Sequence, residues 1–175
     1  MRSQLRKDYI QDKYVIIAPS RSKRPRLLAH DKKFAKNICP FCPESLAKAK
    51  DLLTLGANPW QVKVIPNKFP AVSLDNPQAY GQQEIVIETP DHVKELENLG
   101  VEHITEVLKA YAERTAEIAK DMRMQYVLIF KNSGGAAGAS LIHSHSQIFA
   151  TEFLPPHILD KCQKVQEYKI RHGKC

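Results

Sequence analysis

Two histidines and a glutamine occupy every second position in one segment late in the chain. His143, His145 and Gln147 would therefore project from one face of an extended segment. Neutral imidazole is abundant near pH 7, so a histidine needs no strong base to act as a nucleophile. An amide group beside it can stabilise charge on a phosphate oxygen. The spacing favours phosphoryl or nucleotidyl transfer with histidine as the nucleophile.

A glycine-rich loop comes directly before these residues. The segment 132–140 contains Gly134, Gly135 and Gly138 among mostly small residues. Such a loop lets the backbone lie close to a ligand, and its N–H groups can bind phosphate oxygens. The alternative interpretation is that the two histidines are merely solvated and follow an ordinary turn. The glycine-rich loop together with the alternate spacing of the histidines and the glutamine disfavours it.

A Cys-x-x-Cys pair, Cys39 and Cys42, lies in the first third of the chain. In a thioredoxin-like redox site such a pair follows a buried strand, but residues 31–37 are mostly polar and predict no strand. The pair can instead supply two of the four ligands of a tetrahedral zinc ion. Two unmodified thiols in a turn are a third interpretation, because a single Cys-x-x-Cys is weak evidence.

The histidine segment resembles the active-site signature of galactose-1-phosphate uridylyltransferases, a branch of the histidine-triad superfamily. The shared pattern is Gly138-x-Ser140-x-x-His143-x-His145-x-Gln147-Ile148-x-Ala150. The family usually has proline between its two histidines, whereas Ser144 occupies that position here. Serine there is similar to what related nucleotidyltransferases of the branch have, including ADP-glucose phosphorylases.

This resemblance implies a two-step transfer. His145 would attack the α-phosphorus of a nucleoside diphosphate sugar, and a hexose 1-phosphate would then take the nucleotidyl group from the histidine. Gln147, Ser140 and the loop N–H groups would stabilise charge on the phosphate oxygens. Asn132 and Gly138 would shape the loop or contact phosphate, although a turn-forming asparagine needs no such role. UMP is the nucleotide that the resemblance favours.

The resemblance also implies a structural zinc site. The ligands would be Cys39, Cys42, His92 and His143. Taken alone, His92 would be an ordinary surface histidine at a helix N-terminus. A metal bound to His143 would anchor the strand that presents His145.

Two earlier segments resemble substrate-binding parts of the family. Arg21 and Arg24 match arginines that hold substrate phosphate groups, although a basic loop can also be merely solvated. Asn67 and Phe69 match residues that contact the base and ribose. Between them Lys68 replaces the family's usual acidic residue, and an ammonium group cannot accept hydrogen bonds from ribose hydroxyls. An adenine nucleotide, as in ADP-glucose phosphorylase, is the main alternative to uridine.

Apolar periodicity predicts the elements that must position these residues. Helices are expected over 101–122 and 158–170, and strands over 14–19, 84–88, 125–130 and 148–150. The segment 62–72 is expected to be an apolar strand that ends in a turn. With the resemblance, they give an α+β fold: a histidine-triad-like antiparallel sheet with one long helix packed on it and a C-terminal helix. Residues 1–175 would form a single domain, the N-terminal half of the family's two-domain architecture.

The composition suits this interpretation. A chain of 175 residues with 43% hydrophobic content can bury one core, and a net charge of +7 suits an anionic partner. The basic patch 21–26 lacks interleaved aromatic residues, so no nucleic-acid partner is expected. No apolar run reaches the roughly twenty residues of a membrane span and no signal peptide is evident, so we expect a cytoplasmic protein without a membrane partner. The four cysteines do not suggest a disulfide framework.

Two other functions remain open. With water as the acceptor, the same chemistry would make a histidine-triad nucleotide hydrolase; a zinc-stabilised module could also bind nucleotides without turnover. Family sites are assembled across a dimer, so the resemblance implies a homodimer. It also implies a role in galactose and carbohydrate metabolism, with nucleoside diphosphate sugars and sugar 1-phosphates as substrates.

Overall fold

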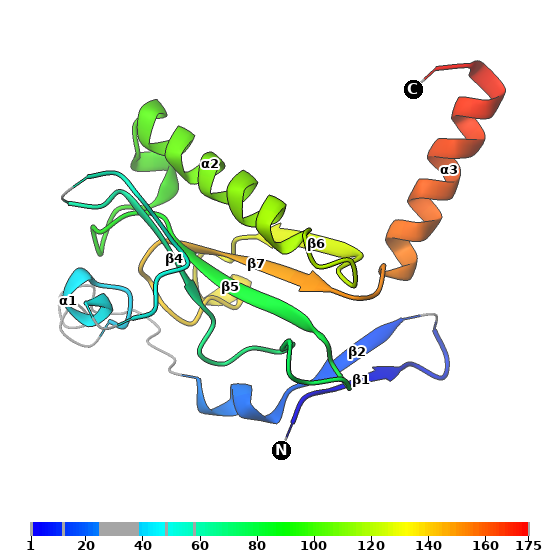
Figure 1. The fold of residues 1–175 in the computed structure, drawn as a ribbon, viewed down its shortest axis with the longest axis horizontal. Helices are drawn as coiled ribbons and strands as arrows, with labels where there is room; N and C mark the ends of the chain where they lie inside the picture. The colour runs from blue at the N-terminus through cyan, green and yellow to red at the C-terminus, as the bar shows by residue number, and fades with distance from the viewer. Residues whose placement is uncertain (1, 12, 25–38, 48, 58, 175) are drawn as a thin grey trace.

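The computed structural model describes residues 2–11, 13–24, 39–47, 49–57 and 59–174, so the polar segment 31–37 lies outside the described residues. An antiparallel sheet lies at the centre, with the strand order β3-β4-β5-β7-β6 (Figure 1). Its strands are β3 (Leu53–Leu55), β4 (Val62–Pro66), β5 (Gly81–Ile87), β6 (Tyr126–Phe130) and β7 (His145–Thr151). This sheet, with one long helix packed on it, confirms the predicted α+β class.

The pairing of β5 with β7 decides which residues share a face of the sheet. The register runs from Gly81 opposite Thr151 to Ile87 opposite His145. Opposed residues of an antiparallel pair point to the same side of the sheet. His145 and Gln147 therefore share one face, and the residues that alternate with them face the other way.

One long helix, α2 (Val101–Ile118), covers this second face. Its buried residues Val107, Ala110 and Ile118 pack in one apolar core with Val62, Val64, Val86, Ile148 and Ala150 of the sheet. The helix ends at Ile118, earlier than the predicted residue 122. Asp121 supplies the reason, because its carboxylate accepts the N–H of Arg123 at 3.0 Å and the hydroxyl of Tyr80, which fixes a turn.

The segment around the two cysteines covers the first face. The short helix α1 (Pro43–Leu46) begins directly after Cys42 with proline at its first position, which suits a helix start. A second apolar cluster forms on this side from Cys39, Phe41, Cys42, Leu46, Ile85 and Ile87. The face that carries His145 is thus packed against the Cys-x-x-Cys segment.

The remaining elements flank the sheet. β1 (Gln4–Lys7) and β2 (Tyr14–Ile17) form a separate two-stranded ribbon. Short 3-10 turns cover Pro19–Lys23, Leu96–Asn98 and Gly135–Ala137. The last helix, α3 (Pro156–His172), projects away from the sheet in Figure 1 and has no buried residue. Within the described ranges, no helix combines the length and apolar character needed to span a bilayer.

Candidate active site and metal centre

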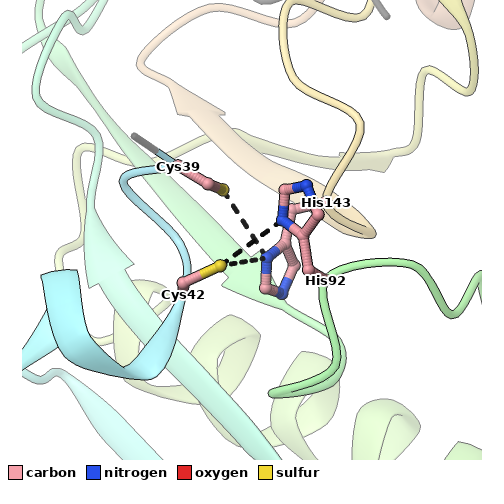
Figure 2. Close-up of side chains that lie close together, drawn as sticks. All are labelled: Cys39, Cys42, His92 and His143. Carbon is pink, nitrogen blue, oxygen red and sulfur yellow. Dashed lines mark hydrogen bonds between the residues drawn. The ribbon is translucent and has the colours of Figure 1, made fainter. Parts of the chain in front are cut away.

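Four side chains converge beside the start of β7. Figure 2 shows Cys39, Cys42, His92 and His143 pointing toward one another, and all four are buried. Their potential ligand atoms lie within 4.8 Å of one another. The Cys42 Sγ lies 3.4 Å from Nδ1 of His92 and 3.7 Å from Nδ1 of His143, and the Cys39 Sγ lies 3.6 Å from Nδ1 of His143.

The elements explain why these residues meet. β5 and β7 are neighbours, and His92 follows the end of β5 whereas His143 precedes the start of β7. The two cysteines approach from the first face of the sheet in a tight turn, in which the Cys42 N–H donates to the Cys39 carbonyl at 3.4 Å. The structure thus brings together all four residues of the proposed ligand set.

The geometry fits a tetrahedral zinc ion. Zn–S and Zn–N bonds of ordinary length place a sulfur and a nitrogen ligand about 3.6 Å apart, and the three S–N distances of the cluster lie between 3.4 and 3.7 Å. The Nε2–H of His143 donates to the Thr89 carbonyl at 2.8 Å, so the lone pair of Nδ1 faces the thiols. Metal-bound histidines typically donate their second N–H in this way.

Burial of these four side chains favours the binding of a cation. Burial raises the pKa of the Cys39 thiol, and burial also lowers the pKa of His143 to about 4. Neutral imidazole is the form that binds metal, and a divalent cation would offset the cost of a buried thiolate. Cys39, Cys42, His92 and His143 can therefore hold the predicted zinc ion.

His145 lies between this cluster and a cavity of about 500 Å³. Its Nδ1–H donates to the carbonyl of His143 at 2.8 Å, which leaves the lone pair of Nε2 for the cavity. Burial, the largest cause, lowers the pKa of His145, and the bond to His143 acts in the opposite direction. The neutral ring is the form that a nucleophile requires. Phe41 packs on this ring with the two centroids 5.0 Å apart.

The cavity is lined by a mixture of apolar and positively charged groups. Its volume lies within the usual range for small-molecule sites. Three cationic side chains, Arg24, Lys50 and Lys68, line it, and no carboxylate does so among the described residues. A cavity of this charge suits a diphosphate ligand.

Ser140 and Gln147 line the cavity together with His145. The Gln147 carbonyl oxygen accepts a hydrogen bond from the Gln83 side chain at 2.8 Å, so the amide N–H groups of Gln147 are left to face the cavity. Gln83 also accepts the N–H of Ala71 at 2.8 Å. The sequence analysis missed Gln83, because the predicted strand 84–88 began one residue later. Extending the alternation of that strand back by one residue puts Gln83 on the same face as Ile85, which pairs with Gln147.

The turn at residues 67–69 forms another part of the cavity wall. Asn67 and Phe69 both line the cavity, and the Asn67 side chain accepts the N–H of Phe69 at 2.9 Å, which fixes the turn. Lys68 also faces the cavity, where the resemblance predicts a carboxylate. The Arg21 guanidinium donates to the Phe69 carbonyl at 3.0 Å and braces this turn. Arg24, in contrast, lines the cavity itself.

The glycine-rich loop leads into the cavity wall. Gly134 and Gly138 have φ angles of +77° and +82°, a left-handed conformation that favours glycine. Ser140, at the end of the loop, lines the cavity, whereas Asn132 and Gly138 are not among the described residues that do so. The loop therefore presents Ser140 beside His145.

Comparisons with known proteins agree with this fold. The ADP-glucose phosphorylase of Arabidopsis thaliana is 32% identical over 98% of this chain and 55% of its own length. The galactose-1-phosphate uridylyltransferase of Haemophilus influenzae is 30% identical over 93% of this chain and 50% of its own length. The crystal structure of an A. thaliana ADP-glucose phosphorylase with bound ADP-glucose superposes with a TM-score of 0.74 and 31% identity, over 100% of this chain and 57% of that one.

This chain spans about half the length of the curated relatives it matches. Its residues 1–155 match the family described as galactose-1-phosphate uridyl transferase, N-terminal domain. On the match over these residues and the identity to both relatives, the chain belongs to the galactose-1-phosphate uridyl transferase family.

Proposed function

We propose that this protein transfers a nucleoside monophosphate from a nucleoside diphosphate sugar to a hexose 1-phosphate or another phosphate-bearing acceptor. One observation carries the proposal. The Nδ1 of His145 is committed to a backbone carbonyl, so Nε2 is the nitrogen available to a cationic cavity large enough for a sugar nucleotide. The names of the family relatives support the same class of reaction.

The first step is attack by Nε2 of His145 on the α-phosphorus. A phosphorus–nitrogen bond forms as the bond to the bridging oxygen breaks, and the sugar 1-phosphate leaves with the electron pair. A phosphate oxygen of the acceptor then attacks the same phosphorus, which releases the new nucleoside diphosphate product and regenerates neutral His145. The Nδ1–H bond to the His143 carbonyl stabilises the positive charge that the ring carries in between.

Other side chains stabilise the charge that develops on the phosphate oxygens. The Gln147 amide and the Ser140 hydroxyl are placed beside His145, and Arg24 adds a positive charge at the cavity. Arg21 contributes by holding the turn that carries Phe69. Zinc bound by the Cys/His cluster would supply rigidity at the start of β7.

Two nucleotides are candidates. The family description favours UMP. An adenine nucleotide is favoured by Ser144 between the histidines and by the similarity to an ADP-glucose phosphorylase. Lys68 in the cavity wall departs from the family pattern, but a ribose contact does not distinguish the two bases. The donors to test are therefore UDP-glucose and ADP-glucose.

Intact-protein mass spectrometry tests this proposal. After incubation with each donor, we expect a mass gain of one UMP or one AMP group, which is lost again when a sugar 1-phosphate or inorganic phosphate is added. His145→Ala should form no adduct while keeping its fold and its metal. If neither donor leaves an adduct although both bind, the chain is a nucleotide-binding module; if water alone removes the adduct, it is a hydrolase.

The assembly of the protein also belongs to this proposal. We infer a homodimer, and light scattering in solution checks this state. We further propose that residues 1–175 form one histidine-triad-like domain, supported by the match of residues 1–155 to an N-terminal domain. The two-domain architecture and the cytoplasmic location stay predictions.

A further inference from the structure

We propose that Glu88, Ser144 and Lys131 form a hydrogen-bonded clamp that positions His145 relative to the glycine-rich loop. This clamp is distinct from the four-residue metal cluster and does not line the cavity among the described residues. Its role in catalysis rests on the proposed function, because it positions the nucleophile of that reaction.

The three side chains form a closed triangle of hydrogen bonds. The Ser144 hydroxyl donates to Oε2 of Glu88 at 2.6 Å. The Lys131 ammonium group donates to the same carboxylate oxygen at 2.6 Å and to the Ser144 hydroxyl at 2.6 Å. The Glu88 side chain is 0% exposed, and Ser144 is 1% exposed, so these bonds are shielded from water and are correspondingly strong.

The clamp joins three segments that carry the site. Glu88 directly follows β5. Lys131 directly follows β6 and precedes the glycine-rich loop, and Ser144 lies between the two histidines at the start of β7. Fixing these three points to one another fixes the loop and the nucleophile as a single unit. A displacement of about 1 Å at a reacting group can cost a factor of about 100 in rate.

Backbone bonds transmit the position of the clamp to the imidazole. The Glu88 N–H donates to the Ser144 carbonyl at 3.2 Å, beside the side-chain bond between the same two residues. His145, the next residue, has its ring held by the carbonyl of His143. The peptide units on both sides of Ser144 are therefore restrained, from the face of the sheet opposite to His145.

The chemistry of the clamp argues for a role in geometry. A buried ion pair is costly to desolvate, and an apolar replacement of similar volume is often equally stable. The restraint is placed where the family usually has proline, whose ring would fix the backbone at that residue. Serine lacks this constraint, and its hydroxyl is instead tied to two charged partners.

Two buried carboxylates on the same face of β5 and its extension, Glu84 and Glu88, provide a matched test. Glu84 in β5 is also 0% exposed and is paired with Arg114 under α2. We expect Ser144→Ala and Glu88→Gln to slow formation of the nucleotidyl-His145 adduct about 10- to 100-fold, with KM for the donor changed far less than kcat. Ser144→Thr, which keeps the hydroxyl, should restore most of the rate. Glu84→Gln should lower Tm without a comparable loss of rate.

Equal slowing in Glu84→Gln and Glu88→Gln would overturn the proposal, as would adduct formation by Ser144→Ala at the wild-type rate. If Glu88→Gln does not fold, the two Ser144 variants decide. If the unaltered protein forms no adduct, the proposed function fails instead, and amide hydrogen exchange then tests the clamp alone. Exchange at residues 143–147 should rise in Ser144→Ala and not in Glu84→Gln; unchanged exchange in both variants contradicts the clamp.

Discussion

Gln147 can offer its amide N–H groups to the cavity because Gln83 donates to its carbonyl oxygen. Gln83 is itself held by the N–H of Ala71 and by Arg21, at 2.8 Å and 3.3 Å. Its amide therefore has one orientation, with the oxygen toward Arg21 and the nitrogen toward Gln147. At the scale of single residues, one glutamine thus fixes the direction in which another donates.

We expect Gln83→Leu to slow adduct formation about tenfold, because a buried acceptor that loses its partner costs about 1–3 kcal/mol and Gln147 turns to satisfy it. Rapid-quench mass spectrometry with UDP-glucose and ADP-glucose measures this rate. Gln82→Leu is the control, since Gln82 bonds Glu84 on the face covered by α2. Similar slowing in both variants would contradict the role given to Gln83.

Without the family resemblance, the site residues that the sequence could predict are those whose type and spacing are local. His143, His145 and Gln147 alternate within five positions, and the cysteines lie three apart. Gln83 and Gln147 are separated by 64 positions, and Lys131 and Glu88 by 43. Such pairs depend on the register of β5 with β7 and on the end of β6, which a single sequence does not specify. Arg21 stays a prediction as a phosphate ligand; the structure shows its guanidinium bonded to the Phe69 carbonyl and to Gln83.

At the scale of elements, the Cys-x-x-Cys turn and the start of β7 depend on one another. The turn supplies two thiols, whereas the strand entry supplies His143, and Phe41 within the turn packs in the same cluster as Ile87 of β5. A bound ion would give the two buried thiols and the two buried imidazoles one shared ligand centre. We therefore expect the local structure of both segments to depend on a bound metal.

We expect Cys42→Ala to lose zinc, to lower Tm and to slow adduct formation, because three remaining ligands hold the ion weakly and the turn is released. Metal analysis, thermal unfolding and adduct formation give the three readouts. Cys162→Ala is the matched control, because this thiol is exposed on α3 and should leave all three unchanged. Full zinc occupancy in Cys42→Ala would contradict the assigned ligand set.

Zinc retention should also fall as the pH falls. Burial raises the pKa of the Cys39 thiol, so protons compete with the metal for this ligand at higher pH than for an ordinary thiol. Metal release to a chelator, followed across a pH series, should accelerate on acidification. Release that is independent of pH would contradict thiolate ligation.

Elements with a continuous apolar or amphipathic run could be predicted, including the four-residue β2, whereas short elements without such a run could not. α2 and the strands with strong apolar runs were expected close to their observed positions. β1, β3 and α1 have only three or four residues each, too few for a period of 2 or 3.6 to be recognised. The early end of α2 depends on the contacts of Asp121 with Arg123 and with Tyr80, which lies far away in sequence.

At the scale of the whole molecule, the paired strands β5 and β7 contribute side chains to both faces of the central sheet. Their shared register places the cavity and the Cys/His cluster on one side of the sheet and the main apolar core on the other. The end of this pair remote from the site begins at Gly81, opposite Thr151. Close packing there supports the strands along their full length.

We expect Gly81→Ala to reduce the free energy of unfolding by about 1–3 kcal/mol, as overpacking of a core does. An added Cβ would lie 2.3 Å from the Ala150 carbonyl oxygen and 2.8 Å from Cγ2 of Val72, so the strands must shift. Urea denaturation measures the change. Val101→Ala, at a residue 81% exposed, should have little effect; equal stability of the Gly81 variant and the unaltered protein would contradict this account.

Phe41 belongs both to the cysteine turn and to the wall of the cavity. If a bound ion raises the affinity of the cavity for a sugar nucleotide, the bound nucleotide must raise the affinity of the cluster for the ion by the same factor. This reciprocity follows from thermodynamic linkage. We therefore expect saturating donor to lower the fraction of metal that a chelator removes at equilibrium. In a zinc-starved cell, molecules already carrying their nucleotide would be the last to lose the ion.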